Sequence, residues 1–527
     1  MKGNLVLLFA IGILLFTSCG NNNEVVLKNG ISIQLDNTTT SLVVGGSQKL
    51  IYNIDPINPV WLSTDTTIAK VNSVGIITAI SVGKASVTVR GDNNFSAKCD
   101  VNVVSSPVSS LVIPNYPITN GSTFIIEGKG FKKEDKIWLR KIEGSSKSSK
   151  IKKQNSSVNT SQSNDFLATI HEVAENFISL SAGVSDGWYY VILNSDSTTY
   201  NLGSLQFNTK VFPEYTYDKT KIFWEDTHWR RFQLRGKVKS MTTTDAYYPY
   251  WTTAHAYNFN KNGYLESFAQ IPNDGSLHGY TTYQYDNNNK LIKKSKHSDS
   301  NPSSTGNVEE FIYGSHSMYV QSSIFNVVDS DFQPEYYNSF YYGIGAVDHT
   351  MNSDLEMWLK GLTGIKFYST GYSCTLDITS NTVSYTYTGS KQIDKTTYYY
   401  QGNFPYKSTE NSIDVTTGQK SYRDSCTYEF SSTGMRQKKI DTYYSKSYTS
   451  DWITNCPFNL YKTYEDYGFK FSYDKNWDMT TFFDGYQTVT FYYASYDEYG
   501  NWTECTVVED DGTSKTIEKL SRKFTYW

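Results

Sequence analysis

The chain has 527 residues, which at the usual domain size is enough for about three domains. Its 48 basic and 52 acidic residues nearly balance, so it lacks the basic field that nucleic-acid binding requires. Aromatic residues make up 16% of the chain, tyrosine alone contributes 44 residues, and only 19% of the residues are charged. This composition favours strands and turns over helices, so we expect an all-β protein without a nucleic-acid partner.

The N-terminal residues have the pattern of an export signal. Met1-Lys2 supplies a positive charge, and Leu5 to Phe16 is an apolar run ending at Thr17-Ser18-Cys19. This run of about 12 residues is too short for a membrane span, which needs about 20. The pattern resembles a bacterial lipoprotein signal. The resemblance implies a signal peptide over 1–18, lipid on Cys19, a polar tether over 19–28 and an outer-membrane anchor facing the cell surface. The alternative is a plain secretory signal.

Residues 29–105 contain short strand-like segments separated by turn residues. The order is Trp61-Leu-Ser, Gly75-Ile-Ile-Thr-Ala, Gly83-Lys-Ala and Val87-Thr-Val. This order resembles the group 2 bacterial immunoglobulin-like domain (BIG2). The resemblance implies a β-sandwich that acts as a spacer or adhesive unit and has no catalytic residues. We expect Trp61 to fill the space between the sheets, and Gly75 and Gly83 to turn the chain where a Cβ atom would clash.

Residues 106–211 form a second predicted unit. Gly128-Lys-Gly130-Phe131 and the later Gly187-Trp-Tyr-Tyr-Val are similar to strands of the IPT/TIG immunoglobulin-like fold. The two glycines do not make a phosphate loop, because no Lys-Ser/Thr pair and no helix pattern follow them. The lysine- and serine-rich stretch at 144–157 cannot form a core and is predicted to be a surface loop.

Tyrosine is concentrated in residues 212–527, where an aromatic-x-aromatic strand, a polar turn and an apolar restart recur. Copies begin at Tyr257, Tyr283, Tyr428, Phe471 and Tyr496. They resemble degenerate YD (RHS-type) repeats of Bacteroidetes surface lipoproteins, which implies a large antiparallel domain of β-hairpin repeats. A capping box at 353–356, followed by apolar residues up to Leu362, predicts one helix.

The fold class predicted for the chain is therefore all-β. Two tandem immunoglobulin-like β-sandwiches are followed by a large antiparallel domain of hairpin repeats.

No motif in the chain predicts catalysis, a metal or a cofactor. The histidines are scattered, no CxxC or HExxH is present, and adjacent carboxylates such as Glu309-Glu310 would point to opposite faces of a strand. We expect Cys99 to pack as a small hydrophobe. Whether Cys374, Cys426, Cys456 and Cys505 form a disulfide is left open by their spacing.

Runs of aromatic residues supply the candidate binding residues Tyr336, Tyr341, Tyr399 and Tyr492. Because neighbours on a strand point to opposite faces, one set of rings fills a core and the other can stack on sugars or proteins. The alternative is that the rings form cross-strand ladders that only stabilise the sheet.

The sequence favours a non-enzymatic, monomeric surface lipoprotein whose partners are the membrane, through its lipid, and a glycan or a surface protein. One alternative is a glycan-binding accessory lipoprotein of a polysaccharide-uptake system. Another is a hydrolase whose site is assembled only by folding.

Overall fold

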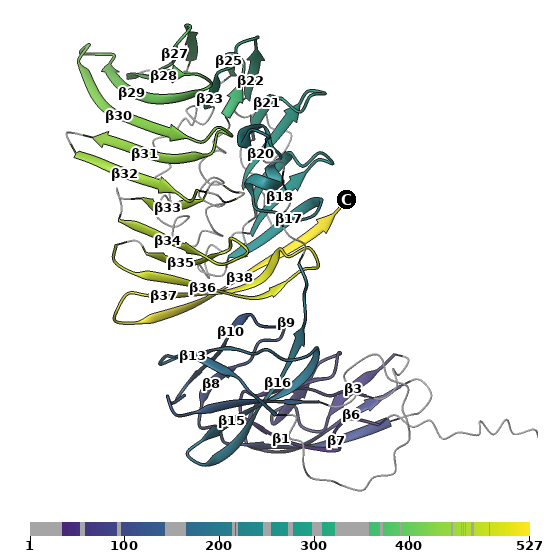
Figure 1. Cartoon of the computed structure of the whole chain (residues 1–527). Helices are drawn as coiled ribbons and strands as arrows, with labels where there is room; N and C mark the ends of the chain where they lie inside the picture. The colour runs from purple at the N-terminus through teal and green to yellow at the C-terminus, as the bar shows by residue number, and fades with distance from the viewer. Residues whose placement is uncertain are drawn as a thin grey trace, which may run out of the picture.

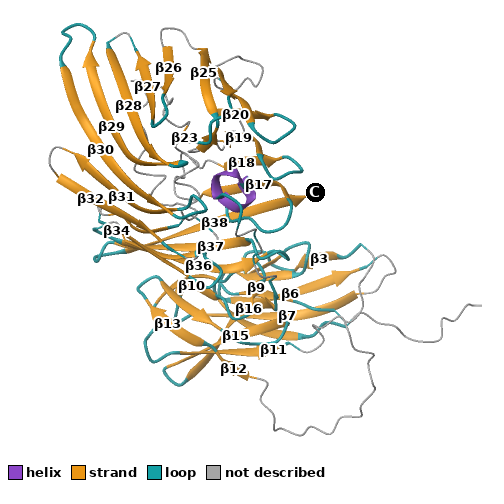
Figure 2. Cartoon of the chain, turned by 45° about the horizontal axis from the view of Figure 1, so that its top comes forward, coloured by secondary structure: helices purple, strands orange, loops and turns teal. Residues whose placement is uncertain are grey.

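The computed structural model describes residues 34–527 except 53–57, 92–95, 143–164, 213–214, 216, 218–219, 246–253, 272–277, 298–307, 322–357, 369–372, 390, 444–445, 455, 457, 459, 465–467 and 484. The predictions for the signal peptide, Cys19, the tether and the loop at 144–157 lie outside the described residues, as do Tyr336 and Tyr341. Figures 1 and 2 show that the described chain is built almost entirely of strands. The predicted all-β class, two immunoglobulin-like sandwiches followed by a large antiparallel sheet, is confirmed.

The first sandwich contains β1 (Thr39–Val43), β2 (Ser47–Lys49), β3 (Val60–Ser63), β4 (Ala69–Val71), β5 (Ile76–Ala79), β6 (Gly83–Arg90) and β7 (Ser96–Val104). One sheet has the order β1-β7-β6-β3, and β2, β5 and β4 lie in the second layer. Alternate residues of β6 and β7 point into the aliphatic core, and Cys99 is fully buried there, as predicted.

The predicted roles of Gly75 and Gly83 are confirmed. Both have positive φ, and a Cβ atom on Gly75 would lie 2.4 Å from the Trp61 ring. On Gly83 it would lie 2.7 Å from Ile68. Trp61 itself is only partly buried and packs against the edge of the core, so it does not fill the centre between the sheets as expected.

The second sandwich contains β8 (Ser109–Val112), β9 (Ile118–Thr119), β10 (Thr123–Lys129), β11 (Lys136–Lys141), β12 (Asp165–Leu167), β13 (Thr169–Val173), β14 (Phe177–Ser181), β15 (Gly187–Ser195) and β16 (Thr198–Asn208). Its sheets have the orders β13-β14-β10-β8 and β12-β11-β15-β16. The second sheet continues without a break into β2-β5-β4 of the first sandwich, because β16 pairs with β2 at Gly203 and Ser47. The two sandwiches are therefore fused through one shared sheet.

Gly203 makes this fusion possible. Its φ is +141°, and a Cβ atom there would lie 2.1 Å from the carbonyl oxygen of Ser47, so only glycine allows the two strands to approach. Polar contacts continue the join, since Ser204 Oγ accepts a 2.8 Å hydrogen bond from the backbone N–H of Lys49. The hydroxyl of Tyr190 donates a 3.2 Å hydrogen bond to Asp36.

The remaining strands, except β23 (Tyr319–Gln321) and β24 (Trp358–Lys360), form one antiparallel sheet that closes on itself, here called the closed sheet (Figure 1). Its strands are β17 (Val238–Asp245), β18 (Ala254–Phe259), β19 (Leu265–Ile271), β20 (His278–Tyr285), β21 (Leu291–Lys296), β22 (Val308–Tyr313), β25 (Leu362–Tyr368), β26 (Ser373–Ile378), β27 (Thr382–Thr388), β28 (Gln392–Gln401), β29 (Phe404–Asp414), β30 (Lys420–Phe430), β31 (Arg436–Tyr443), β32 (Lys446–Trp452), β33 (Tyr461–Tyr464), β34 (Phe469–Tyr473), β35 (Met479–Phe483), β36 (Thr488–Tyr496), β37 (Trp502–Asp510) and β38 (Lys515–Tyr526). The ring closes where β17 pairs with β38, with Met241 opposite Phe524, and we call this pairing the seam.

The aromatic residues account for much of the core of the closed sheet. Tyr257, Phe259, Tyr283, Tyr385 and Tyr398 are all buried in one cluster. A second cluster near the C-terminal strands is also rich in aromatic rings. This arrangement corresponds to the predicted stabilising role of the rings, because the side chains that face the core pack on one another rather than on solvent.

The predicted helix ending near Leu362 is wrong in its described part. Trp358–Lys360 is a strand, β24, and pairs with β23 (Tyr319–Gln321). The capping box itself lies outside the described residues. The helices that the structure does describe are the 3₁₀ turn η1 (Phe223–Glu225) and the single turn α1 (His228–Arg231), and neither is long and apolar enough to cross a membrane.

Candidate functional site: recurring turns, the domain junction and the seam pocket

One turn geometry recurs along the closed sheet. In the copy that begins at Tyr496, Asp497 donates its backbone N–H to the carbonyl of Asn501. Its carboxylate accepts hydrogen bonds of 2.9 Å from the backbone N–H groups of Tyr499 and Asn501. Gly500 completes the turn with a φ of +91°. An Asp or Asn side chain that accepts from the backbone two residues ahead stabilises such a turn, which explains why the motif places Asp after the aromatic strand.

The copies at Asn260, Asp286 and Asp474 make the same pair of side-chain hydrogen bonds. The copy at Ser431 makes one, in which its hydroxyl oxygen accepts from the N–H of Met435. Neighbouring copies touch, since Asn262 donates to Asn289 over 2.9 Å and the Tyr285 hydroxyl donates to the Leu265 carbonyl over 2.8 Å. The predicted motifs thus mark hairpin turns that pack side by side.

The two described binding candidates lie in different surroundings. Tyr399 is partly buried on the face opposite its buried neighbours Tyr398 and Tyr400, with Lys407 Nζ 5.8 Å from its ring. Tyr492 is partly buried against the second sandwich, where its hydroxyl donates a 3.3 Å hydrogen bond to Glu172. The structure does not bring these two rings together into one surface.

Tyr492 belongs to a junction between the second sandwich and the closed sheet. Its apolar part is a buried cluster of Ile125 and Phe177 from the sandwich with Val508 from β37. Around it, Lys519 pairs with Glu127 at 2.5 Å. Tyr116 of the sandwich shares a hydrogen bond with Thr506. The junction therefore combines a small hydrophobic centre with a polar rim.

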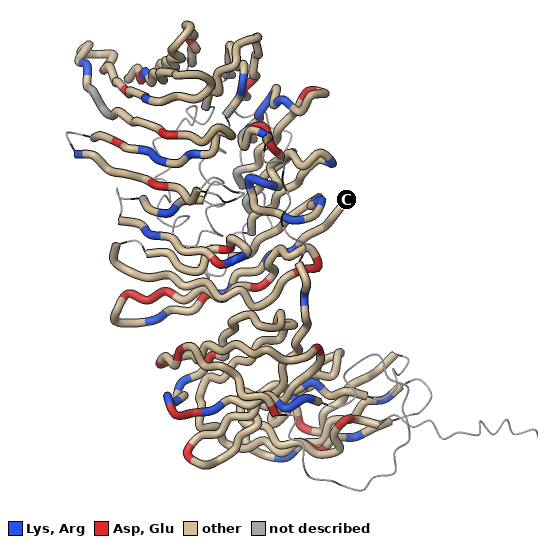
Figure 3. Tube along the Cα trace, in the orientation of Figure 1, with Lys and Arg blue, Asp and Glu red and all other residues tan. Residues whose placement is uncertain are grey.

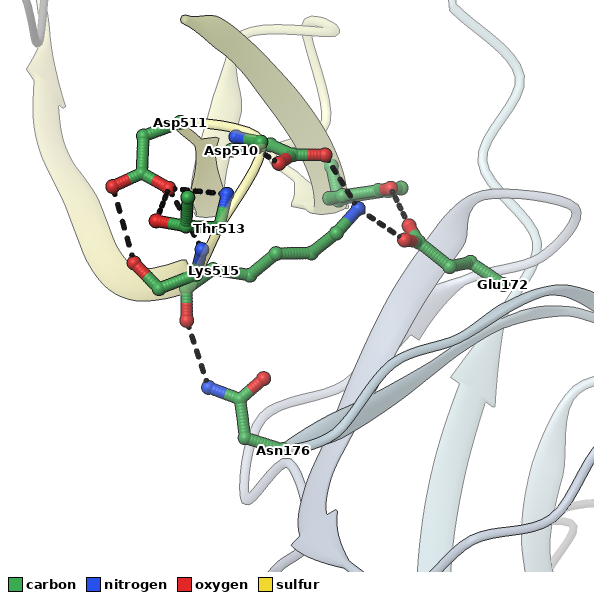
Figure 4. A network of polar contacts seen from close by, with 9 residues as sticks. Glu172, Asn176, Asp510, Asp511, Thr513 and Lys515 are labelled. Atoms are coloured by element: carbon green, nitrogen blue, oxygen red, sulfur yellow. Dashed lines mark hydrogen bonds and ion pairs between the residues drawn. The ribbon is translucent and has the colours of Figure 1, made fainter.

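Lys515 is the main polar residue of the junction (Figure 4). Its ammonium lies 2.5 Å from Glu172 of the sandwich and 2.9 Å from Asp510 of its own hairpin. Its backbone carbonyl accepts a 3.0 Å hydrogen bond from Asn176. Burial lowers the pKa of Lys515, but the bonds to Glu172 and Asp510 outweigh this effect and raise it. The lysine is therefore charged and bridges the two domains at physiological pH.

The hairpin that carries Lys515 is held by Asp511. Its carboxylate accepts hydrogen bonds from the side chain and N–H of Thr513 and from the N–H of Ser514, which lowers its pKa to about 2. Gly512 takes a φ of +82° there, a backbone conformation that glycine adopts without steric cost. The turn presents Lys515 to the sandwich.

A pocket lies beside the seam, and we call it the seam pocket. It is lined by Gln233, Arg235, Asn476, Asp478, Met479, Tyr493, Gly500, Asn501, Trp502 and Arg522. These residues come from the segment before β17, from the turns after Tyr473 and Tyr496, and from β35 to β38. The pocket therefore joins the first and last parts of the closed sheet.

The polar groups of the seam pocket are held in fixed positions. Asn501, 4% exposed, accepts from the N–H of Arg235 at 2.7 Å and donates to its carbonyl at 2.8 Å. The Arg522 guanidinium lies 3.8 Å from the centre of the Trp502 ring, a close cation–π contact. The Arg235 guanidinium donates to the Asn476 carbonyl at 3.3 Å.

Asp478 is the carboxylate of the seam pocket. Burial and the nearby Asp474 raise its pKa to about 7, against the opposing effects of Arg522 and Arg235 and of a hydrogen bond from Tyr496. Burial also raises the pKa of Asp474, although backbone N–H bonds oppose this. The two neighbouring carboxyl groups therefore oppose each other's ionisation, because each negative charge disfavours the other.

Sequence reasoning did not identify the fusion at Gly203, the junction or the seam pocket. The pocket residues Arg235, Asp478 and Arg522 lie far apart in the sequence. The only sequence signal near any of them was the turn motif that precedes Asp478. In the described part of the chain, no three His, Cys, Asp or Glu side chains cluster as metal ligands. Cys426, Cys456 and Cys505 are free thiols, and the side chain of Cys374 lies outside the described residues.

Comparison with known proteins identifies the first sandwich. Residues 31–101 match the family of the bacterial Ig-like domain (group 2), so the chain contains a domain of this family. An uncharacterised protein of Clostridium acetobutylicum is 32% identical over 108 residues, which cover 19% of this chain. The match spans only 27% of that relative's length.

Among solved structures, similarity is low. Domains 4 and 5 of the S-layer protein SbsC are 12% identical, with 29% of this chain and 70% of that chain covered and a TM-score of 0.11. A DUF4784 family protein from Bacteroides caccae is 9% identical, with 78% of this chain and 96% of that chain covered and a TM-score of 0.15. Similarities this weak assign no function.

Proposed function

We propose that this chain is an exported, non-enzymatic, lipid-anchored protein of the cell surface. In this proposal the fused sandwiches form a rigid base that holds the closed sheet in one orientation. The closed sheet then has a structural role or binds a partner. Two connections between domains support the proposal best. The shared sheet at Gly203 joins the two sandwiches, and the junction at Lys515 joins the second sandwich to the closed sheet. A chain of independent modules would need neither.

The anchor of this base would be a lipid on Cys19, which follows the short apolar run and the small residues Thr17 and Ser18. Several acyl chains on one cysteine would give stable attachment to the outer membrane, whereas a single chain binds only marginally. Basic and acidic residues are interspersed over the described chain, so charge offers no other broad membrane-binding surface there (Figure 3).

The finer domain assignments belong to this proposal. An IPT/TIG-like second sandwich is supported by Gly128 and Gly130, where a Cβ atom would lie 2.4 Å from Val108 and 2.7 Å from the Pro107 carbonyl oxygen. A YD-type repeat origin of the closed sheet is supported by the shared turn geometry at Asn260, Asp286 and Asp497.

The anchor is tested by replacing Cys19 with serine and following fatty-acid labelling and membrane association. We expect both to be lost, because serine has no thiol to take lipid, while the tether variant Asn21→Ser keeps them. Protease treatment of intact cells then tests surface exposure. Labelling that persists in C19S would show that the anchor is elsewhere.

A glycan-binding role is the second candidate, and a partly exposed aromatic, Tyr399 beside Lys407, is the observation in its favour. We expect any sugar bound there to stack on the ring and to depend little on salt. A glycan array probed with the full chain and with Tyr399→Ala tests this role. Binding that vanishes at high salt and survives Y399A would exclude stacking on this residue.

A further inference from the structure

We propose that the outward face of β28 and β29 binds an acidic polysaccharide, a chain of sugar units that carry carboxylate or sulfate groups. The proposal rests on the glycan-binding candidate at Tyr399 and adds the extent of the site and the charge of its ligand. Six residues form this face, here called the β28–β29 face, and they pair across the two strands: Lys395 with Asn411, Thr397 with Thr409, and Tyr399 with Lys407.

Alternation along the strands decides which side chains belong to the face. Tyr398 is buried in the core inside the closed sheet, so Thr397 and Tyr399 on either side of it point outward. By the same alternation Asp394 and Glu410 point inward, away from the face. Figure 1 shows β28 and β29 at the end of the closed sheet that lies away from the sandwiches, so the sandwiches leave the face uncovered.

The face carries positive charge. Lys395 and Lys407 are its charged residues, and in the described part of the chain neither ammonium group takes part in an ion pair. Outward carboxylates follow on β26, at Asp377, and on β30, at Glu429, and Glu429 lies opposite Lys438 of β31. The charge of the face follows from residue type and strand register, and it complements a ligand that carries several negative groups.

The separation of the two lysines favours a polymer over a small molecule. Lys395 lies four residues from Tyr399, the cross-strand partner of Lys407. The Cα atoms of the two lysines are therefore about 14 Å apart, from the usual rise per strand residue and the usual spacing between strands. One sugar unit is too short to reach both ammonium groups. An extended chain can place an acidic group on each, and the second contact then forms at a high effective concentration.

Groups that suit sugar hydroxyls and sugar rings lie on the face and beside it. Thr397 and Thr409 place two hydroxyls at its centre, and a hydroxyl can both donate and accept hydrogen bonds. The Thr397 hydroxyl also lies 3.0 Å from that of Ser384 on β27, which holds it in place. Tyr399 offers a partly exposed ring, and Tyr406, in the bulge of β29, is 48% exposed. Such rings stack on sugars, so the face suits a sugar chain better than another polyanion.

Isothermal titration of the full chain tests the proposal with an oligogalacturonate and a dextran sulfate, each long enough to reach both lysines. We expect at least one of them to bind, with an affinity that falls as NaCl is raised but is not lost, because salt screens the ion pairs and leaves the stacking intact. Galacturonate as a single sugar reaches one lysine, and the neutral oligomer of galactose pairs with neither, so each should bind about tenfold more weakly.

Lys395→Gln and Lys407→Gln should each weaken binding about threefold, the effect of one exposed ion pair, and the double variant about tenfold. Thr409→Val, which keeps the shape of the side chain and loses its hydroxyl, should weaken binding about threefold. The matched control Lys523→Gln, on the outward side of β38, should bind as the unaltered protein does.

The proposal would be overturned if both acidic polymers failed to bind, or if the double lysine variant bound them as the unaltered protein does. It would also be overturned if polyglutamate bound as tightly as the acidic sugars, because charge alone would then be recognised. The glycan-binding candidate fails separately. If neutral and acidic oligomers bind equally and only Tyr399→Ala weakens them, that candidate stands and the acidic ligand is wrong.

Discussion

The fused sandwiches and the closed sheet are both β-structures, but they are held together in different ways. The sandwiches meet at a close backbone approach, where Gly203 and Gly46 leave room for β16 to lie against β2. The closed sheet distributes its stabilisation over many similar turns and a large aromatic interior. A close approach of two backbones is sensitive to one substitution, whereas a turn repeated many times should tolerate the loss of any one copy.

Gly203→Val should have the largest effect in the chain. The new side chain would overlap the Ser47 carbonyl, so we expect a loss of about 3–4 kcal/mol in the free energy of unfolding, the range of severe steric lesions. Chemical denaturation would measure it. The matched control is Gly121→Ala, which also has positive φ but no atom within 4 Å of its Cβ position. It should cost only about 1 kcal/mol of backbone strain. Equal effects of the two variants would refute the special role of Gly203.

Asp478→Asn should change how the stability of the closed sheet depends on pH. The folded-state pKa is raised from 3.8 to about 7, so the protein favours the neutral carboxyl. Its contribution is present below pH 4 and is lost as pH rises to 7. The variant stays neutral throughout, so it should match the unaltered protein at pH 4 and unfold at a higher temperature at pH 8. A variant that is less stable at pH 8 would contradict the raised pKa.

A substitution in one of the recurring turns should have a smaller effect on stability. Asp286→Ala removes the acceptor for two backbone N–H groups, those of Asn288 and Lys290, which are exposed enough to bind water instead. We expect a loss of about 1 kcal/mol, as for the removal of a helix cap. Asp286→Asn should cost little, because Asn260 performs the same role in the preceding copy. Thermal denaturation of the two variants would compare them.

Lys515→Met should have the smallest effect on stability. The ammonium is about one-third exposed, so its ion pairs are screened and we expect a loss of about 0.5–1 kcal/mol at low salt and less at high salt. Small-angle scattering would show whether the closed sheet still sits on the sandwich. Unchanged scattering would show that the apolar contacts of Phe177 and Val508 are enough to hold the junction.

The parts of this fold that could be predicted from the sequence are those encoded locally. Alternating apolar residues and glycines marked the first sandwich, and an aromatic strand followed by Asp or Asn marked the turns. The helix prediction failed because Trp358–Lys360 pairs with the distant Tyr319–Gln321, and tertiary pairing overrides local preference. The approach of Gly203 to Ser47 and the meeting of Arg235 with Asp478 depend on which strands become neighbours, and no local pattern records that.

Closure of the large sheet has a consequence for how copies of this protein can meet. A strand at the edge of an open sheet presents unpaired N–H and C=O groups that can add a strand from another chain, a common route to aggregation. In the described residues, the ring of strands from β17 to β38 has no such edge. The sheets of the sandwiches end in β1, β3, β4, β8, β12 and β13, which do. If crowded molecules on a membrane add strands to one another, they should do so through the sandwiches, and the closed sheet should stay separate.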